Sequence, residues 1–500
     1  MAEAPGGGLP SAAGLGQCRG TMGGTVDLLI RGGTVVTAER SFRADVAVAG
    51  ATIVAVGPGL SGPARPAARE IDATGRLVIP GGIDPHAHLE QRSGAGLMNA
   101  DTFESAHRAA LLGGTTTVVS FAAQPPGVRP GDAVADYAAR AARGALADHA
   151  FHLIVADPAH LAEDLPALAE AGHRSLKLFT TYPAVRLDDG QVIGVMTLAR
   201  RHGALCCIHA ETDALLGWTK EALLARGLTR PPFHAVAHPR LAEIDAVERM
   251  IRFAEFTGAR IMVFHLSTAE AADAVRRAKA RGLPVHAETC PHYLLTGPEV
   301  LERADGAKWM CSPPQRGAAD RAAIWAALED GTIDLVSSDH APYRMDDTGK
   351  LAHGPDAPFD RIANGMPGLQ TRMALVWDAL ARRGLPPTLF VRLCCEAPAR
   401  LHGLTGKGRI EPGAEADLVI WNPDATRIWG EADLDDNAGY NPWAGHQTTG
   451  APKTVILRGA VVADGGRVLA LPGSGRYLPR PPFPQGTPAP EARVALGESG

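Results

Sequence analysis

Two patterns of apolar and polar residues divide the chain. In the middle of the sequence, apolar runs of about five to eight residues alternate with longer stretches rich in alanine, leucine, arginine and glutamate. This alternation is typical of repeated strand–helix units that build a parallel sheet. It predicts eight strands, at residues 77–83, 115–121, 151–156, 175–179, 205–209, 261–265, 284–289 and 334–338.

The stretches between these strands predict helices, some of which end at glycines. Examples are residues 103–112, followed by Gly113 and Gly114, residues 269–281, followed by Gly282, and residues 321–328. Eight such units over roughly 330 residues have the size of a (β/α)8 barrel of the TIM type with insertions. The predicted fold class is therefore α/β. An open, doubly wound sheet is the alternative, because periodicity does not show whether a sheet closes.

Both ends of the folded region show a different pattern. Short alternating runs punctuated by glycine, such as residues 27–33, 45–50 and 52–57, predict β-hairpins, and the same style returns at residues 417–421 and 454–459. The two ends therefore predict one small β-sandwich domain built from both termini. The expected organisation is a flexible leader (1–25), an N-terminal sandwich segment (26–76), the barrel (77–412), a C-terminal sandwich segment (413–470) and a C-terminal arm or tail (471–500).

Side chains that bind metals follow the ends of several predicted strands. His86 and His88 come just after the apolar run 77–79 and the breaker Pro80-Gly81-Gly82, and two histidines at i and i+2 of an extended segment point to the same side. Neutral imidazole is a preferred ligand of borderline metals. Each histidine alone is more often a core residue. Because barrels place their chemistry at strand ends, the whole set is a candidate metal centre: His86, His88, Lys177, His209, His265 and Asp339.

Composition narrows the function classes. The net charge is −5 and the sequence has no basic stripe, which argues against a nucleic acid partner. No apolar stretch approaches the roughly 18 residues of a membrane span. The seven cysteines show no spaced framework and no C-x-x-C pair, which favours reduced thiols in a cytoplasmic protein.

The strand-end residues lie in phrases that resemble a known family. The chain is similar to the amidohydrolase superfamily, and within it to the hydantoinase/dihydropyrimidinase branch. The matching phrases follow in the family's order between about residues 26 and 470. They are Gly81-Gly82-Ile83-Asp84-Pro85-His86-Ala87-His88-Leu89, Gly113-Gly114-Thr115-Thr116-Thr117, Ser175-Leu176-Lys177-Leu178-Phe179, His209-Ala210-Glu211, Glu288-Thr289-Cys290-Pro291-His292-Tyr293-Leu294, Met310-Cys311-Ser312-Pro313-Pro314, Ser338-Asp339-His340 and Asn364-Gly365-Met366-Pro367-Gly368.

The resemblance implies two divalent metal ions, usually zinc, that share Lys177 as a bridging ligand. The other ligands would be His86, His88 and Asp339 for the buried ion, and His209 and His265 for the second ion. In the family the lysine is carboxylated by carbon dioxide, which turns a cation into a bridging carboxylate (N6-carboxylysine). This modification also resolves an energetic difficulty, because a lysine between apolar neighbours is unfavourable to bury unless it is modified or paired.

The resemblance also implies a reaction, the opening of the cyclic amide ring of hydantoins or dihydropyrimidines by a metal-bridging hydroxide. Asp339 would act as general base and then as general acid towards the leaving ring nitrogen. Tyr182, five residues after Lys177, would stabilise the developing oxyanion. Ser312 and Asn364 would hold the imide edge of the ring, largely through backbone groups. Members of the family are usually homotetramers, so the expectation is a cytoplasmic homotetrameric cyclic amidase.

Three departures from the family's pattern lie close to the expected site. Thr212-Asp213 stands where the family usually has Asn-Gly, Ala341 stands where Cys is frequent, and Thr180-Thr181 stands where larger apolar residues are common. None of them removes a ligand. They leave the exact substrate open.

Two alternatives follow from the same residues. Allantoinase-like or dihydroorotase-like ring hydrolysis shares all the ligands, although Tyr182 favours the hydantoinase branch. A dihydroorotase would also need a cation for the substrate carboxylate, for which Arg92 is the obvious nominee. A non-catalytic scaffold is the alternative from a different class, and the retention of all six ligands argues against it.

Overall fold

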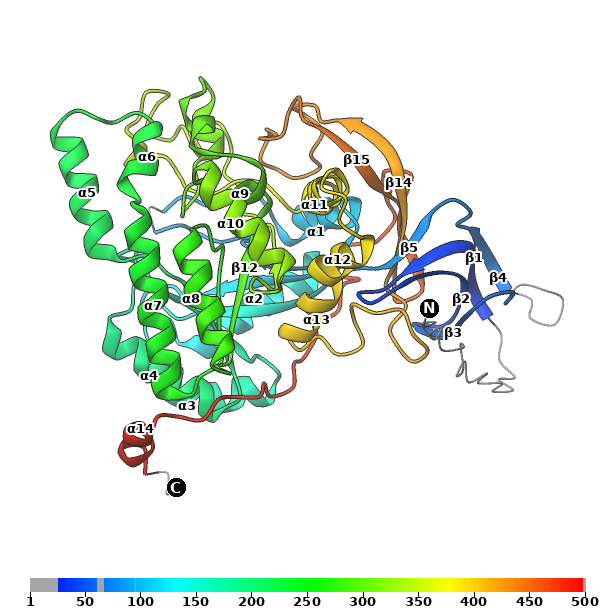
Figure 1. Ribbon diagram of the computed structural model, residues 1–500, viewed down its shortest axis with the longest axis horizontal. Helices are drawn as coiled ribbons and strands as arrows, with labels where there is room; N and C mark the ends of the chain where they lie inside the picture. Colours follow the sequence, from blue (N-terminus) through cyan, green and yellow to red (C-terminus); the bar gives the residue numbers. More distant parts are fainter. Residues whose placement is uncertain (1–25, 61–66, 95, 498–500) are drawn as a thin grey trace, which may run out of the picture.

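The computed structural model describes residues 26–60, 67–94 and 96–497. The leader expected at residues 1–25 lies outside these ranges. Figure 1 shows a barrel surrounded by helices on the left and a second, mixed sheet on the right, to which the first and the last strands both contribute.

The barrel is a sheet of eight parallel strands in sequential order, from β6 to β13. Its edges meet, because Ala87 at the end of β6 forms a parallel bridge with His340 just after β13, and the His88 N–H donates to the His340 carbonyl at 2.7 Å. The sheet is therefore closed, which confirms the predicted barrel and excludes the open alternative. The strands are β6 (Gly82–Ala87), β7 (Thr115–Ala123), β8 (Asp148–Ile154), β9 (Ser175–Phe179), β10 (Leu205–His209), β11 (Ile261–Val263), β12 (Val285–Thr289) and β13 (Leu335–Val336).

The strand predicted at residues 77–83 was wrong, because two strands occupy this stretch. β5 (Leu77–Pro80) belongs to the mixed sheet, and the barrel strand β6 begins only at Gly82. The chain passes between the two sheets at Gly81, where an added Cβ would lie 2.1 Å from the Thr116 hydroxyl oxygen, so the passage requires glycine. As a consequence, His86 lies within a strand rather than after one.

Helices surround the barrel. The helix predicted at 103–112 is α1 (Phe103–Leu112), whose first turn is closed by a capping box between Thr102 and Ser105. The helices predicted at 269–281 and 321–328 are α8 and α10, with shifted ends. The longer helices are α1, α2 (Pro130–Gly144), α3 (Leu161–Glu170), α4 (Asp189–Arg201), α5 (Asp213–Ala225), α7 (Arg240–Thr257), α8 (Ala269–Ala280), α10 (Ala318–Glu329) and α11 (Arg372–Arg382). The short ones are α6 (Pro232–Ala237), α9 (Pro291–Leu295), α12 (Pro387–Val391), α13 (Ala397–Leu401) and α14 (Pro490–Ala495).

The mixed sheet joins both ends of the described chain, as predicted for the small β domain. Its strand order is β17-β16-β15-β14-β5-β1-β2-β3, and β4 pairs with β1. The sheet packs on an apolar cluster that includes Ile30 from the first strand and Ile420 from a late one. Its strands are β1 (Val26–Val36), β2 (Ser41–Ala49), β3 (Thr52–Gly57), β4 (Ala67–Asp72), β5, β14 (Leu418–Ile428), β15 (Gln447–Leu457), β16 (Ala460–Asp464) and β17 (Arg467–Val468).

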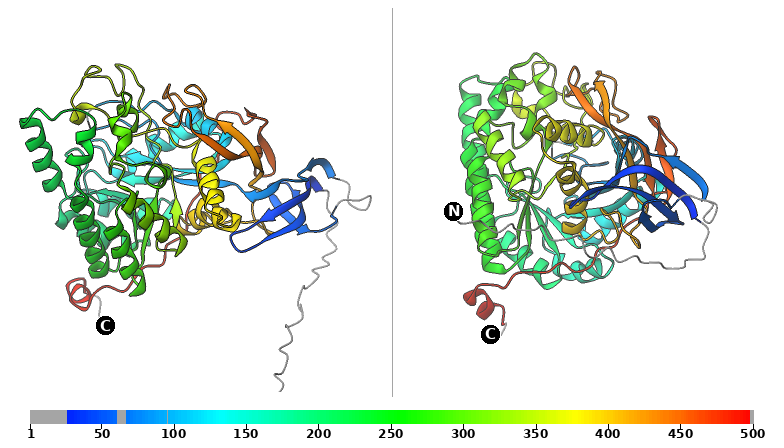
Figure 2. Two further views of the ribbon diagram at one scale, coloured as in Figure 1. Left: turned by 45° about the horizontal axis from the view of Figure 1, so that its top comes forward. Right: turned by 45° about the vertical axis from the view of Figure 1, so that its right-hand side comes forward.

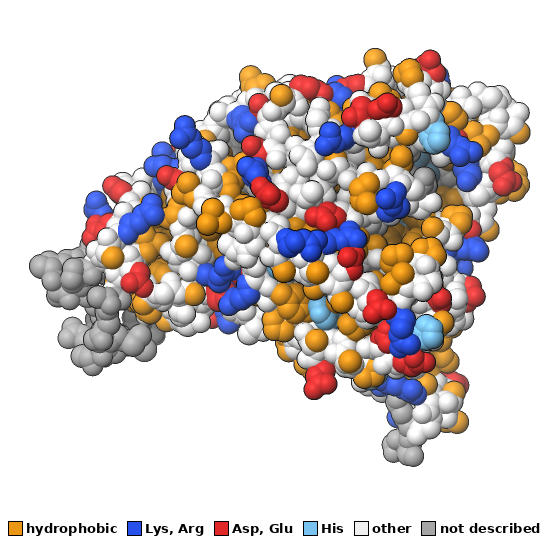
Figure 3. All heavy atoms as spheres, turned by 180° about the vertical axis from the view of Figure 1, so that it is seen from behind, with side chains coloured by type: hydrophobic (Ala, Val, Ile, Leu, Met, Phe, Trp, Pro, Cys, Tyr) orange, Lys and Arg blue, Asp and Glu red, His pale blue; other side chains and the backbone are white. Residues whose placement is uncertain are grey.

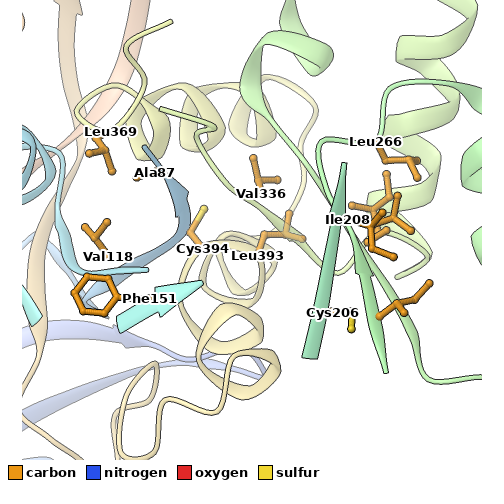
Figure 4. Close-up of a cluster of buried hydrophobic side chains, with 14 of the residues drawn as sticks. Ala87, Val118, Phe151, Cys206, Ile208, Leu266, Val336, Leu369, Leu393 and Cys394 are labelled. Carbon is orange, nitrogen blue, oxygen red and sulfur yellow. The ribbon is translucent and has the colours of Figure 1, made fainter. Parts of the chain in front are cut away.

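The largest apolar core lies between the barrel strands and the helices that cover them. Figure 4 shows some of its residues, with Val118 and Phe151 from neighbouring strands and Leu393 and Cys394 from the helical region after α12. Six cysteines in the described ranges are free and buried, namely Cys206, Cys207, Cys290, Cys311, Cys394 and Cys395.

The surface carries charges of both signs. On the face shown in Figure 3, Lys and Arg side chains are interspersed with Asp and Glu side chains. Among the described helices, none combines the length and the apolar character that a membrane crossing requires.

The segment after the mixed sheet runs along the amino-terminal end of the barrel strands and forms what we call the C-terminal strap, residues 476–489 (Figures 1 and 2). Its backbone N–H groups donate to the carbonyls of His149 (2.8 Å) at the start of β8, of Gly203 (2.9 Å) before β10 and of Gly258 (2.8 Å) before β11. Its Arg480 side chain is buried and donates to the Ser175 hydroxyl at 2.6 Å. The strap therefore covers the end of the barrel opposite the predicted site.

A buried ionic cluster joins the barrel to the mixed sheet. The Lys407 ammonium lies 2.6 Å from Asp148, 2.8 Å from Glu415 and 2.5 Å from Asp417. Asp148 begins β8 of the barrel, whereas Asp417 precedes β14 of the mixed sheet. One lysine thus holds carboxylates from both sheets of the molecule.

We predict that Lys407→Met lowers Tm strongly, because it leaves three carboxylates without their central cation. Breaking a buried ion pair from one side destabilises proteins by about 3–5 kcal/mol. Thermal unfolding followed by circular dichroism measures the effect, and Lys220→Met, on the exposed face of α5, is the control. Equal Tm values for the two variants would contradict this role of Lys407.

Candidate active site

Three predicted ligands meet at the carboxyl end of the barrel, where the sheet closes. His86 and His88 come from β6 and the residue after it, and Asp339 follows β13. The Asp339 Oδ1 atom lies 2.9 Å from His86 Nε2 and 3.5 Å from His88 Nε2. One ligand atom from each of the three lies within 4.8 Å of the others, which is a spacing that could hold a metal ion.

The far nitrogen of each of these imidazoles has its own partner. His86 Nδ1 pairs with Glu288 Oε1, and His88 Nδ1 donates to Gln91 Oε1 at 2.7 Å. A hydrogen bond at one ring nitrogen fixes the tautomer and leaves the other nitrogen as a lone-pair donor, as in most metal-binding histidines. The partners therefore turn both Nε2 atoms towards Asp339.

Lys177 lies on β9 with its amine surrounded by aromatic rings. Its Nζ is 4.2 Å from the ring centre of Phe264, 4.8 Å from that of Phe179 and 5.5 Å from that of Phe121. Within the described ranges of the chain, the amine has no hydrogen-bond partner. Burial lowers the pKa of Lys177 to about 8, although the charge of Asp339 opposes this shift. A substantial fraction of the amine is therefore neutral near pH 8.

His209 and His265 lie side by side, with ring centres 4.6 Å apart. His209 Nε2 is 2.8 Å from Glu211 Oε2, and the other oxygen of Glu211 is 2.9 Å from His238 Nδ1. The Nδ1 atom of His209 is thereby left as the lone-pair donor. Burial, followed by the neighbouring His209, lowers the pKa of His265 well below its usual value, so its ring is neutral.

Tyr182 lies beside His209 and interacts with the hydroxyl of Ser312. The ring of Tyr182 is 5.1 Å from that of His209. Burial raises the pKa of the Tyr182 phenol well above 10, while the hydroxyl of Ser312 acts in the opposite direction. Asn364 belongs to a segment that bonds to the segment carrying Ser312, because the Gly365 N–H donates to the Met310 carbonyl at 2.8 Å.

Several of these residues have a strained backbone. Tyr182 (φ 72°), His265 (φ 40°) and Asp339 (φ 48°) adopt the left-handed region, which side-chain-bearing residues rarely enter. Such conformations persist only where the surrounding structure enforces them, and they cluster at functional sites.

Two other groups of acidic and histidine side chains have ligand-like spacing, but their ligand atoms are already engaged. In the first, His340 Nε2 donates to Asp101 at 2.8 Å and His340 Nδ1 accepts from the Gly368 N–H at 3.0 Å. The second group, Asp148, Glu415 and Asp417, surrounds the Lys407 ammonium. Among the residues that the structure describes, the group of His86, His88 and Asp339 is therefore the best candidate for a metal.

The departures noted in the sequence contact one another. The Thr181 hydroxyl donates to Asp213 Oδ1 at 2.9 Å, and the Arg186 guanidinium donates to Asp213 Oδ2 at 2.8 Å. These two contacts lie on either side of Tyr182 in the chain. Thr180 is tied in the same way, because its hydroxyl donates to the Glu211 carbonyl at 2.8 Å. The unusual residues thus anchor the loop that carries Tyr182.

The structure also shows the contacts of Ala341, the remaining departure, and of Arg92, the cation considered for a dihydroorotase-like substrate. Ala341 packs against Gly365, where an added Cβ would lie 2.6 Å from that of Ala341. Arg92 donates to the Gly96 carbonyl of its own loop at 2.6 Å, so its guanidinium is already partly engaged.

Sequence reasoning did not assign roles to Glu288, Glu211, Gln91 or His238, although they orient the imidazoles. Two of them could have been found, because Glu288 and Glu211 are carboxylates at or just after the ends of buried strands, where an unpaired charge is unfavourable. Gln91 lies in a loop and His238 follows the end of α6, and no local pattern distinguishes them.

The fold and this geometry agree with comparisons to known proteins. The model of the amidohydrolase family matches residues 77–462. The D-hydantoinase of Ralstonia pickettii is 36% identical over 465 residues, covering 92% of this chain and 100% of that protein. The D-phenylhydantoinase of Escherichia coli O9:H4 (strain HS) is 35% identical, covering 91% and 98%. The crystal structure of dihydropyrimidinase from Brevibacillus agri NCHU1002 superposes with a TM-score of 0.87 at 35% identity, covering 91% and 99%.

These matches, together with the closed barrel, define a barrel hydrolase with a candidate metal site. The chain belongs to the amidohydrolase family. The resemblance seen in the sequence is thereby confirmed.

We predict that Asp213→Ala loosens the loop that carries Tyr182, because Thr181 and Arg186 lose their shared acceptor. Hydrogen–deuterium exchange should rise at Val185, Arg186 and Leu187, whose N–H groups bond within this loop. The matched control is Asp189→Ala, which also removes a first-turn helix aspartate with an arginine partner, at 3.4 Å. Similar exchange in both variants would count against the anchoring role.

Proposed function

We propose that this protein is a cyclic amidase that opens the ring of hydantoins or dihydropyrimidines. The observation that carries the proposal is the group of His86, His88 and Asp339 beside the buried amine of Lys177, which lacks a hydrogen-bond partner in the described ranges. The relatives named above, D-hydantoinases and a dihydropyrimidinase, point to the same substrate class.

The donor atoms suit two divalent ions, and zinc is the metal that we propose, because it prefers imidazole nitrogen and carboxylate oxygen. His86, His88, Lys177 and Asp339 would hold one ion, and His209, His265 and Lys177 the other. The amine of Lys177 supports this assignment. Only a neutral amine reacts with carbon dioxide, and burial lowers the pKa of Lys177 to about 8, which increases the neutral fraction near neutral pH. Carboxylation would turn the amine into an anion at a position where, in the described part of the chain, the amine has no hydrogen-bond partner.

When bound, the ions would lower the pKa of water, which would supply a hydroxide nucleophile at neutral pH, and they would also polarise the amide carbonyl. Asp339 is ionised, because His86 and His88 hold its pKa well below the usual value even though burial acts in the opposite direction. Its carboxylate can therefore accept a proton and return it to the leaving ring nitrogen.

Tyr182 stays protonated at neutral pH, because burial raises its pKa. Its phenol can therefore donate a hydrogen bond to the oxyanion that develops on the attacked carbonyl. Ser312 and Asn364 would hold the imide edge of the ring through their backbone groups. The homotetramer and the cytoplasmic location implied by the resemblance stay predictions.

We predict ring opening of hydantoin or dihydrouracil by the purified protein, with allantoin, dihydroorotate and 5-phenylhydantoin as further substrates to compare. Metal content measured in parallel should be about two equivalents, and both metal and activity should fall on chelation and in Lys177→Ala. Two equivalents of metal with no turnover of hydantoin or dihydrouracil would contradict the proposed substrate class. Turnover that survives chelation would contradict the metal site.

We predict that Tyr182→Phe lowers kcat by about 10²–10³, the range seen when one oxyanion donor is removed, with little change in KM or metal content. Tyr477→Phe is the matched control. Tyr477 lies in the C-terminal strap, at the opposite end of the barrel, and its phenol forms a hydrogen bond with His173 at 2.9 Å. An unchanged kcat in Tyr182→Phe would remove the phenol from the reaction.

A further inference from the structure

Lys350 is a buried cation that the proposed reaction does not use. Its side chain is 0% exposed, and its Nζ donates to backbone carbonyls, at 2.7 Å from Ala363 and 3.4 Å from Met310. Burial lowers the pKa of Lys350 to about 7, and Cys311 is the group that partly offsets this shift. A buried amine that meets carbonyls rather than carboxylates is unfavourable compared with an apolar side chain of similar volume. We therefore expect that a lysine at position 350 serves a function.

The two carbonyls belong to the two segments that carry the proposed ring-binding residues. Met310 is two residues before Ser312, and Ala363 is next to Asn364. The segments also bond directly, since the Gly365 N–H donates to the same Met310 carbonyl at 2.8 Å. Lys350, which bonds to both carbonyls, thus adds a second link between them.

Each segment is also held by the barrel or by a helix. The imidazole of His234 in α6 bonds to the Cys311 carbonyl at 2.8 Å. The Ala341 N–H, which follows the closure point of the barrel, donates to the Met366 carbonyl at 3.0 Å. These contacts hold each segment separately, whereas Lys350 and the Gly365–Met310 hydrogen bond join the two segments to each other.

A tight turn brings Lys350 into this position. The Asp346 carboxylate accepts from the Thr348 N–H at 2.9 Å and from its hydroxyl at 2.6 Å, and the Lys350 N–H donates to the Arg344 carbonyl at 2.7 Å. Gly349 has no room for a side chain, since an added Cβ would lie 2.2 Å from the Arg344 carbonyl oxygen. The turn is therefore built to carry the lysine inwards.

We propose that Lys350 is a positioning residue for substrate recognition, whose amine fixes the spacing of the segments that carry Ser312 and Asn364 and so shapes the edge that binds the ring. The inference rests on the proposed function, because the two segments matter only if they bind the ring. Backbone contacts to the unreacting imide edge are equally strong in the ground state and in the transition state. Their loss therefore raises KM and leaves kcat nearly unchanged.

The test compares Lys350→Met with wild type by steady-state kinetics on hydantoin and dihydrouracil. We expect KM to rise by about three- to tenfold, the effect of weakening one hydrogen bond, with kcat and metal content within about twofold. Hydrogen–deuterium exchange should rise in residues 310–312 and 363–366. The KM of Lys350→Gln, which keeps an N–H donor, should lie between those of wild type and Lys350→Met. If the methionine variant does not fold, the KM of Lys350→Gln provides the test.

Lys279→Met is the control for the loss of a partly buried lysine away from the proposed site, because Lys279 donates to the Gly331 carbonyl at 3.2 Å and also pairs with Asp334 at 2.7 Å. It should lower Tm without changing KM. An unchanged KM for Lys350→Met, or an equal loss of kcat and metal, would overturn the positioning role. If wild type itself opens neither ring, the proposed function fails. The exchange measurement still decides whether Lys350 joins the two segments.

Discussion

The aromatic enclosure of Lys177 is the constraint on which the carboxyl end of the barrel depends. Among the residues that the structure describes, this amine between three phenyl rings has no hydrogen-bond partner, and the polar groups around it pair with one another instead. They do so in fixed pairs, His86 with Glu288 and His209 with Glu211. These hydrogen bonds restrict the rotation of the two imidazoles, and the remaining ring nitrogens therefore point in defined directions.

Barrel closure and the site depend on the same few residues. Asp339 stands between β13 and His340, the residue that bridges to Ala87 and closes the sheet. The left-handed backbone of Asp339 is unfavourable by about 1–2 kcal/mol in isolation. It is held because His340 is fixed on both ring nitrogens, by Asp101 and by the Gly368 N–H. The strain at Asp339 is thus balanced by the hydrogen bonds that complete the fold.

The sequence predicted the barrel and the small β domain, which the structure confirms, because each has a local pattern of apolar residues. The six residues proposed as metal ligands were also found from the sequence, by their positions near strand ends, and their role as ligands stays a prediction. The sequence failed at residues 77–83, where one apolar run serves two sheets and only the three-dimensional path separates β5 from β6. It also did not predict His238 or Lys350. Their roles arise from contacts with Glu211 and Ala363, which are distant in the chain, and a single charged residue in a polar loop has no periodicity to reveal it.

The shared sheet also determines when the fold can be completed. β5 pairs with β14 across several hundred residues, so the strands synthesised first have no neighbour on that edge until the whole barrel has followed. Such distant pairings form slowly, because a long loop must close before they contribute. An unpaired strand edge is also a site at which another chain can add. The period of greatest exposure to aggregation therefore falls during synthesis, before the segment containing Asp417 and the C-terminal strap has joined the rest of the molecule.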